Sequence, residues 1–242
     1  MSLYANLQQE SAGTKMFDVV WWYSDSQVVL EMNMILKTIV VGQLMENTYI
    51  IASEDTKECV IIDPGDEGPR ILDEVNGLGL TVKLILNTHG HSDHTGAVEF
   101  IRDATGATYC IHQGDVHMLR SSVLKIHSGS DSVLAPDRLV EDGDIFDLGG
   151  IELNVITTPG HTQGSVCYYI KTIGVLFTGD TLFSGSIGRS DMPGGNGRQL
   201  MHGIMNRLMS LPVDTKVYPG HGPDSTIGHE KLTNPFVLRW SE

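Results

Sequence analysis

The chain has 242 residues and a formal net charge of −14, from 30 acidic residues against 16 basic ones. This length suits one large domain or two small ones, and so acidic a surface repels phosphate backbones, which argues against nucleic acid as a partner. No apolar run approaches the about 20 residues of a membrane-spanning helix, and the N-terminus lacks the pattern of a secretory signal. We therefore expect a cytoplasmic protein that does not bind membranes.

Residues 1–31 differ from the rest of the chain, because they lack the glycine-punctuated strand pattern that follows them. Two interpretations are open. The segment is a leader or N-terminal extension, disordered or added upstream, or it supplies an extra strand or a dimer contact. We assign residues 1–31 to this extension and residues 32–242 to one main domain.

From residue 35 onward, short β-branched runs alternate with glycine or proline breaks, which predicts many short strands. In chain order we expect strands at 35–41, 48–52, 59–62, 83–86, 108–111, 151–157, 165–170, 175–178 and 216–217. Apolar residues at helical spacing predict helices at 68–75, 94–104, 199–208 and 227–232. Many strands with few helices indicate an α/β or α+β sandwich.

The three cysteines stand singly inside apolar runs at Cys59, Cys110 and Cys167. An odd number of scattered cysteines does not form a disulfide framework. We expect buried free thiols, as is usual in a reducing compartment.

The most informative stretch of the sequence is 84–96, in which an apolar run is followed by His89, His91, Asp93 and His94. His89 and His91 are two apart, so an extended segment points both imidazoles the same way. Asp93 and His94 follow at the turn into a predicted helix and can face a neighbouring point. One short segment can therefore supply two adjacent cation sites. Imidazole and carboxylate ligands without thiolate suit zinc and are compatible with iron or manganese.

Three further candidate ligands, His161, Asp180 and His221, follow other predicted strands. A glycine directly precedes each of them and allows the backbone to approach a metal closely. His112 also follows a predicted strand, where it is either a structural residue or a support for the ligands.

These motifs, THGHSDH, TPGHT, FTGD and YPGHG, resemble the metallo-β-lactamase superfamily in order and spacing. Within it they are most similar to the glyoxalase II-like (hydroxyacylglutathione hydrolase-like) proteins. The segments DPG at 63–65, GSIGRSD at 185–191 and NPF at 234–236 strengthen this match, which covers about residues 35–238. The resemblance implies an αββα sandwich, with two mixed β-sheets flanked by helices and the site at one edge between them.

The resemblance also implies a dinuclear metal site. One ion would bind His89, His91 and His161, a second would bind Asp93, His94 and His221, and Asp180 would bridge the two. Asp63 would support the ligand loop without touching a metal.

The hypothesis for the chemistry is hydrolysis by two metal ions, most simply zinc. Such ions generate hydroxide near neutral pH, which attacks a thioester or ester carbonyl, and no serine or cysteine nucleophile is needed. Asp93 and Asp180 are the candidate catalytic carboxylates, with Asp93 helping to handle the proton. Arg189 is either a substrate contact or a surface arginine.

Two alternatives stay open. Persulfide dioxygenases share this fold and resemble the chain at 188–191, and they use one iron on counterparts of His89, His161 and Asp180. Full-length glyoxalase II enzymes also carry a C-terminal helical domain with glutathione-binding residues, whereas this chain ends shortly after Phe236. A small-molecule acyl substrate other than a glutathione thioester is therefore an alternative.

Overall fold

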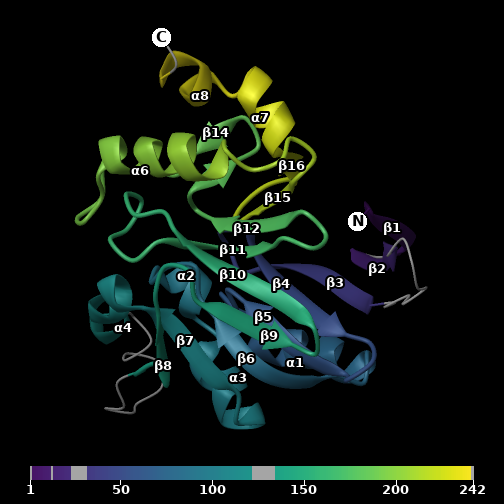
Figure 1. Ribbon diagram of the computed structural model, residues 1–242. Coiled ribbons are helices and arrows are strands. Elements are labelled where there is room, and N and C mark those ends of the chain that lie inside the picture. The colour runs from purple at the N-terminus through teal and green to yellow at the C-terminus, as the bar shows by residue number, and fades with distance from the viewer. Residues whose placement is uncertain (1, 12, 23–31, 122–133, 241–242) are drawn as a thin grey trace.

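The computed structural model describes residues 2–11, 13–22, 32–121 and 134–240. It is a four-layer sandwich in which two β-sheets pack face to face and helices cover their outer faces (Figure 1). This confirms the predicted αββα architecture with mixed sheets. Among the described residues, no helix is long and apolar enough to cross a bilayer.

The first sheet has eight strands in the order β1 to β8. Their bounds are Ser2–Ser11, Thr14–Trp22, Met32–Val41, Glu46–Ser53, Glu58–Ile62, Thr81–Leu86, Thr108–His112 and Arg138–Val140. Strands β1 to β5 pair antiparallel, and β5 to β8 pair parallel. Parallel pairs need a crossover connection, which α1 (Gly68–Gly77) and α3 (Val98–Thr105) supply.

The second sheet has six strands in the order β16-β15-β12-β11-β10-β9. In chain order they span Ile145–Leu148, Ile151–Thr157, Val166–Ile170, Val175–Gly179, Lys216–Pro219 and Ser225–Thr226. A separate small hairpin consists of β13 (Leu182–Phe183) and β14 (Ser186–Ile187). The outer face is covered by α6 (Gly197–Gly203), a π-helical turn η2 (Ile204–Leu208), α7 (Ile227–Thr233) and α8 (Pro235–Trp240).

Alternation along the strands divides the apolar residues among three core layers. In β4, Tyr49 and Ile51 face the second sheet, whereas Ile50 and Ala52 face α1 and α3. In β11, Tyr168 points between the sheets and Tyr169 points toward the outer helices. Because both faces of these strands are buried, their sequences are continuous apolar runs without polar alternation.

The predicted helix at 94–104 is wrong as a single element, because the chain forms α2 (Ser92–Thr95) and then α3. The break is imposed from outside the helix. The Ala97 N–H donates to the carbonyl of Pro64 at 2.9 Å, and a Cβ at Gly96 would lie 2.2 Å from the carbonyl oxygen of Gly65. A second correction concerns 199–208, where the α-helix begins at Gly197, two residues early, and becomes π-helical from Ile204.

The N-terminal segment forms β1 and β2 where the structure describes it, and β2 pairs antiparallel with β3. The ammonium group of Lys15 lies 3.2 Å from both the Tyr218 hydroxyl and the Asp224 carboxylate, so β2 also contacts the second sheet. Residues 23–31 lie outside the described residues, and the domain boundary at residue 31 stays a prediction.

Candidate metal centre

The predicted ligands lie at one edge of the sandwich, where strands from both sheets end. In the first sheet, β6 leads into the segment 87–94, which carries four of them. In the second sheet, β10, β12 and β15 run in the same direction and end just before the other three. Carboxyl ends of strands that run the same way meet at one edge of a sheet. The topology thus gathers the seven side chains His89, His91, Asp93, His94, His161, Asp180 and His221.

His89, His91 and His161 form the first group. The Nδ1 atom of His91 lies 3.0 Å from Nε2 of His89 and 2.9 Å from Nε2 of His161. Ligand atoms that each lie about 2 Å from one ion lie about 3.0–3.5 Å from one another. The spacing of these three nitrogens therefore fits a shared cation.

Asp93, His94 and His221 form the second group. Oδ2 of Asp93 lies 3.3 Å from Nε2 of His221 and 3.8 Å from Nε2 of His94. Here one carboxylate replaces a histidine, so the two groups offer a cation different charges.

Asp180 lies between the two groups. Its Oδ2 atom is 3.6 Å from Nε2 of His161, and its Oδ1 atom is 3.4 Å from Nε2 of His94 and 3.7 Å from Nε2 of His221. Among the described atoms, Asp180 Oδ1 and His94 Nε2 are buried without a hydrogen-bond partner. Because unsatisfied buried polar atoms are costly, a cation between them would satisfy both. The donor set thus fits two divalent cations.

Backbone carbonyls set the ring orientation of two of these histidines. Nδ1 of His161 donates to the carbonyl oxygen of Arg189 at 2.7 Å, and Nδ1 of His221 donates to that of Leu44 at 3.1 Å. A carbonyl only accepts, so Nδ1 carries the hydrogen in both rings. In the neutral ring, Nε2 then keeps its lone pair for a metal.

Asp63 performs the same task for His94 and, through Thr88, for His89. Its Oδ2 atom lies 3.0 Å from Nδ1 of His94 and accepts the Thr88 hydroxyl proton at 2.6 Å. The Thr88 oxygen is then free to accept from Nδ1 of His89, 3.1 Å away. Asp63 also accepts from the amide of Thr88 at 2.7 Å and from Nδ2 of Asn87 at 3.0 Å. Asp63 therefore lies behind the ligand loop, which is the position that a supporting role requires.

The charges of the site move the pKa values of its members in opposite directions. Burial and the neighbouring imidazoles lower the pKa of His89 well below its usual value. Burial also disfavours the charged form of His94, but the carboxylates of Asp180 and Asp63 outweigh it and raise that pKa well above the usual value. Burial would raise the pKa of Asp93, yet the hydrogen bond with His221 and the charge on His94 lower it to about 2.

Glu46 is a buried carboxyl group beside the site that the sequence analysis missed. It is 1% exposed, and its Oε1 atom lies 3.8 Å from Nδ1 of His94. The Thr48 hydroxyl lies 2.8 Å from the Asp63 carbonyl and 3.0 Å from Glu46 Oε2. The Thr48 hydroxyl is the donor in the contact with Glu46 Oε2 and also faces the Asp63 carbonyl. Burial raises the pKa of Glu46 well above its usual value.

The glycines before the later ligands are required by close contacts with other protein atoms. A Cβ at Gly220 would lie 2.4 Å from Asp180 Oδ1, and one at Gly179 would lie 2.2 Å from Thr88 Oγ1. One at Gly160 would lie 2.3 Å from the amide nitrogen of Leu200. The ligands can meet only because these side chains are absent.

Arg189 reaches the site through its backbone and not through its guanidinium group. Its carbonyl accepts from His161, whereas its side chain is 61% exposed and pairs with Asp191 at 2.8 Å. His112 stands apart from the candidate ligands, and its Nδ1 atom accepts from the amide of Gly114 at 3.1 Å. The three cysteines are buried and free, as predicted.

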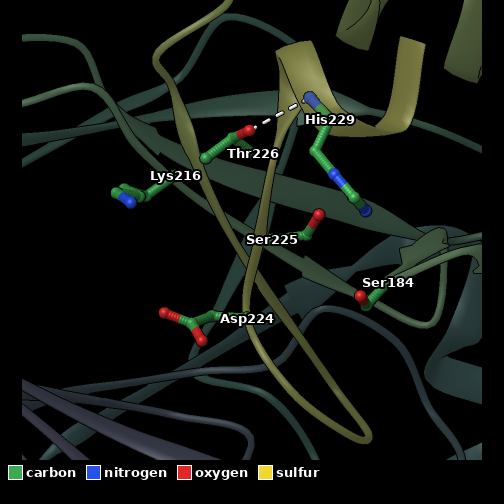
Figure 2. Close-up of a pocket in the computed structure, with 6 residues that line it drawn as sticks. All are labelled: Ser184, Lys216, Asp224, Ser225, Thr226 and His229. Atoms are coloured by element: carbon green, nitrogen blue, oxygen red, sulfur yellow. Dashed lines mark hydrogen bonds between the residues drawn. The ribbon is translucent and has the colours of Figure 1, made fainter. Parts of the chain in front are cut away.

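A hollow of about 460 Å³ adjoins the second group and includes Asp93 in its lining. Its other walls come from the β3–β4 turn and the segments around Gly65 and Ser92. A separate pocket of about 360 Å³ lies beside α7, and Figure 2 shows the six side chains that line it. These six include no candidate ligand, so the hollow beside Asp93 is the better candidate for a substrate.

Comparison with known proteins identifies the family. The family model of the metallo-beta-lactamase superfamily matches residues 41–221, which contain all seven candidate ligands. The chain belongs to this superfamily. A Bacillus subtilis relative, the probable metallo-hydrolase YqgX, is 37% identical and the match covers 83% of this chain and 96% of that protein. The hydroxyacylglutathione hydrolase GloC of Haemophilus influenzae is 35% identical over 76% of this chain and 89% of its own.

Solved structures show the same fold. The B3 metallo-beta-lactamase BLEG-1 superposes with a TM-score of 0.77 at 37% identity, covering 84% of this chain and 99% of its own. A di-iron-bound form of TTHA1623 superposes with a TM-score of 0.71 at 36% identity, and the match covers 82% of this chain and 98% of that chain. ETHE1 from Myxococcus xanthus superposes with a TM-score of 0.70 at 32% identity, and the match covers 83% of each chain. The chain is accordingly a metal-dependent hydrolase of this superfamily, with a histidine and aspartate cluster suited to divalent metals.

Proposed function

We propose that this protein hydrolyses a small acyl thioester or ester, as in the glyoxalase II-like group. Two divalent metal ions, zinc in the first instance, would be held by the first and second groups with Asp180 between them. The observation that carries the proposal is the pair of buried atoms Asp180 Oδ1 and His94 Nε2, which face each other at 3.4 Å and have no hydrogen-bond partner among the described residues. The relative GloC, named as a hydroxyacylglutathione hydrolase, supports the thioester class.

Ions bound there would supply hydroxide at neutral pH and polarise the substrate carbonyl. The protein's own residues bind, orient and manage protons. Asp63 and the carbonyls of Arg189 and Leu44 hold the imidazole rings in the required orientation. Asp93, whose side chain is 23% exposed, borders the hollow. Its low pKa keeps it ionised at neutral pH, so it can help to hold a cation and accept a hydrogen bond from a water molecule activated beside it.

The substrate would enter through the hollow beside Asp93. Val41 and Leu44 supply aliphatic surface there, and Gly65 and Ser92 supply backbone and hydroxyl groups. Such a lining suits a short acyl group whose carbonyl turns toward the ligands. Three buried free thiols fit the cytoplasmic location that we propose.

The direct test is hydrolysis of S-lactoylglutathione by zinc-loaded protein, with His94→Ala as the control. We expect turnover that the variant loses. The same preparation is assayed on acetyl-coenzyme A and on a β-lactam, the substrate class named for BLEG-1. Hydrolysis of the β-lactam alone would overturn the thioester proposal, and so would failure on all three substrates.

The resemblance of residues 188–191 to persulfide dioxygenases favours a second candidate, in which one iron ion serves an oxygen-dependent reaction of a persulfide. Metal analysis separates the two, since the hydrolase needs about two ions per chain. One iron per chain, with oxygen consumed when a glutathione persulfide is added, would favour the second candidate.

A further inference from the structure

Asp115 is a fully buried aspartate that belongs to neither group of candidate ligands. It ends the short 3₁₀ turn η1 (Gln113–Asp115), which directly follows β7 in the first sheet. A buried carboxylate is costly unless its oxygens are well satisfied. The hydrogen-bond partners of the Asp115 carboxylate therefore indicate the role of this residue.

Among the described residues, the hydrogen-bond partners of the Asp115 carboxylate come from the two loops of the first group. Its Oδ2 atom accepts from the amide of Gly90 at 2.9 Å and from the Thr162 hydroxyl at 2.6 Å. Its Oδ1 atom accepts from the amide of Gly164 at 2.7 Å. Gly90 lies between His89 and His91, whereas Thr162 and Gly164 follow His161. One carboxylate thus joins a loop of the first sheet to a loop of the second.

The neighbouring glycines show that the backbone is packed around this carboxylate. A Cβ at Gly164 would lie 2.7 Å from Cγ of Asp115, and one at Gly90 would lie 2.9 Å from its Cβ. Neither loop can carry a larger residue there without moving away from Asp115. The close packing is independent of the hydrogen bonds and points to the same pairing.

The chemistry of the partners requires a carboxylate. Two are backbone amides, which only donate. The third, the Thr162 hydroxyl, also lies 2.7 Å from the Ser165 hydroxyl, which can donate to it and leave the Thr162 proton for Asp115. An asparagine would present its NH₂ group to at least one of these donors and lose that hydrogen bond.

We propose that Asp115 is the positioning residue of the first group, and that it holds the His89–His91 loop and the His161 loop at the separation that a shared cation needs. The inference rests on the proposed metal centre, but not on which substrate is hydrolysed. Loss of a residue that orients metal ligands typically weakens metal affinity by about 10- to 100-fold.

The test compares zinc affinity in two proteins, His221→Ala alone and His221→Ala with Asp115→Asn. The first change disables the second group, so the remaining ion reports on the first group. Competition with a chromophoric chelator should show affinity about 10- to 100-fold weaker in the double variant. Thr162→Val removes one of the three donors to Asp115. In the same background it should also weaken zinc affinity, but by a smaller factor.

Glu230→Gln in the same His221→Ala background is the matched control. Glu230 is also fully buried and accepts from a backbone amide, that of Gly185 at 2.9 Å, and from Asn234 at 2.8 Å. The Glu230→Gln substitution should lower the melting temperature of the chelator-treated protein without changing its zinc affinity. The proposal is overturned if Asp115→Asn behaves like this control. Because the readout is metal binding, absence of thioester hydrolysis in the unmodified protein would leave the result interpretable.

Discussion

Oδ1 of Asp180 lies 3.4 Å from Nε2 of His94, and both atoms are buried without a hydrogen-bond partner among the described residues. The other carboxylate oxygen faces His161 at 3.6 Å, so one side chain joins the two groups. A structural carboxylate would be surrounded by donors, as Asp63 and Asp115 are. Asp180 instead has imidazole Nε2 atoms of both groups around it, which is the arrangement that a bridging ligand needs.

Asp180→Ala should therefore reduce both metal content and turnover. We expect kcat to fall by about 100- to 1000-fold, the range seen when one electrostatic contact to a reacting centre is removed. Metal analysis after dialysis and initial rates on the best thioester would measure the two effects. Unchanged turnover with two bound ions would contradict the bridging assignment.

Gly220→Ala tests the packing of the site. The new Cβ would lie 2.4 Å from Asp180 Oδ1 and 2.6 Å from Cε1 of His94, so a ligand must move. We expect weaker metal binding and a destabilisation of about 1–3 kcal/mol from overpacking. Gly77→Ala is the control, because its Cβ would meet nothing within 4 Å. Equal behaviour of the two variants in thermal unfolding and metal titration would argue against the packing described.

Arg189→Ala separates the two interpretations of this residue. Its carbonyl remains to hold His161, so metal content should be unchanged. If the guanidinium group binds the substrate, KM should rise about tenfold, since a charged hydrogen bond contributes about 1.5 kcal/mol. The kcat value should change little, and Arg189→Lys should recover part of the loss. A KM equal to that of the unmodified protein would make Arg189 a surface arginine paired with Asp191.

The three thiols should resist modification in the folded protein. Burial raises the pKa of Cys59 and Cys110 to about 12 and that of Cys167 to about 11. Only the thiolate reacts, and at pH 8 a raised pKa leaves very little of it. A chromogenic disulfide reagent should therefore label three thiols after denaturation and essentially none before. Rapid labelling of any native thiol at pH 8 would contradict the burial described.

The ligand cluster could be predicted because its chemistry is local in sequence. Histidines at positions 89, 91 and 94 directly follow an apolar run. The glycines before His161, Asp180 and His221 indicate positions where the backbone comes close to other atoms. The longer strands were also predictable, since β-branched runs buried on both faces leave a clear pattern. The predicted strand at 151–157 coincides with β10.

Other features depend on contacts between distant segments, which a single sequence does not display. Asp115 and Glu46 look like ordinary acidic residues, and only the folded structure shows that both are buried beside the site. The break between α2 and α3 arises from Pro64 and Gly65, some thirty residues earlier. The short strands β13, β14 and β16 have two residues each, too few for any periodicity to appear.

The measurement that tests the central claim most directly is turnover of S-lactoylglutathione as zinc is added stepwise to metal-free protein. The proposed dinuclear site predicts that the rate keeps rising until about two equivalents per chain are bound. A rate that is complete at one equivalent, or no hydrolysis at two bound equivalents, would contradict a two-metal thioester hydrolase.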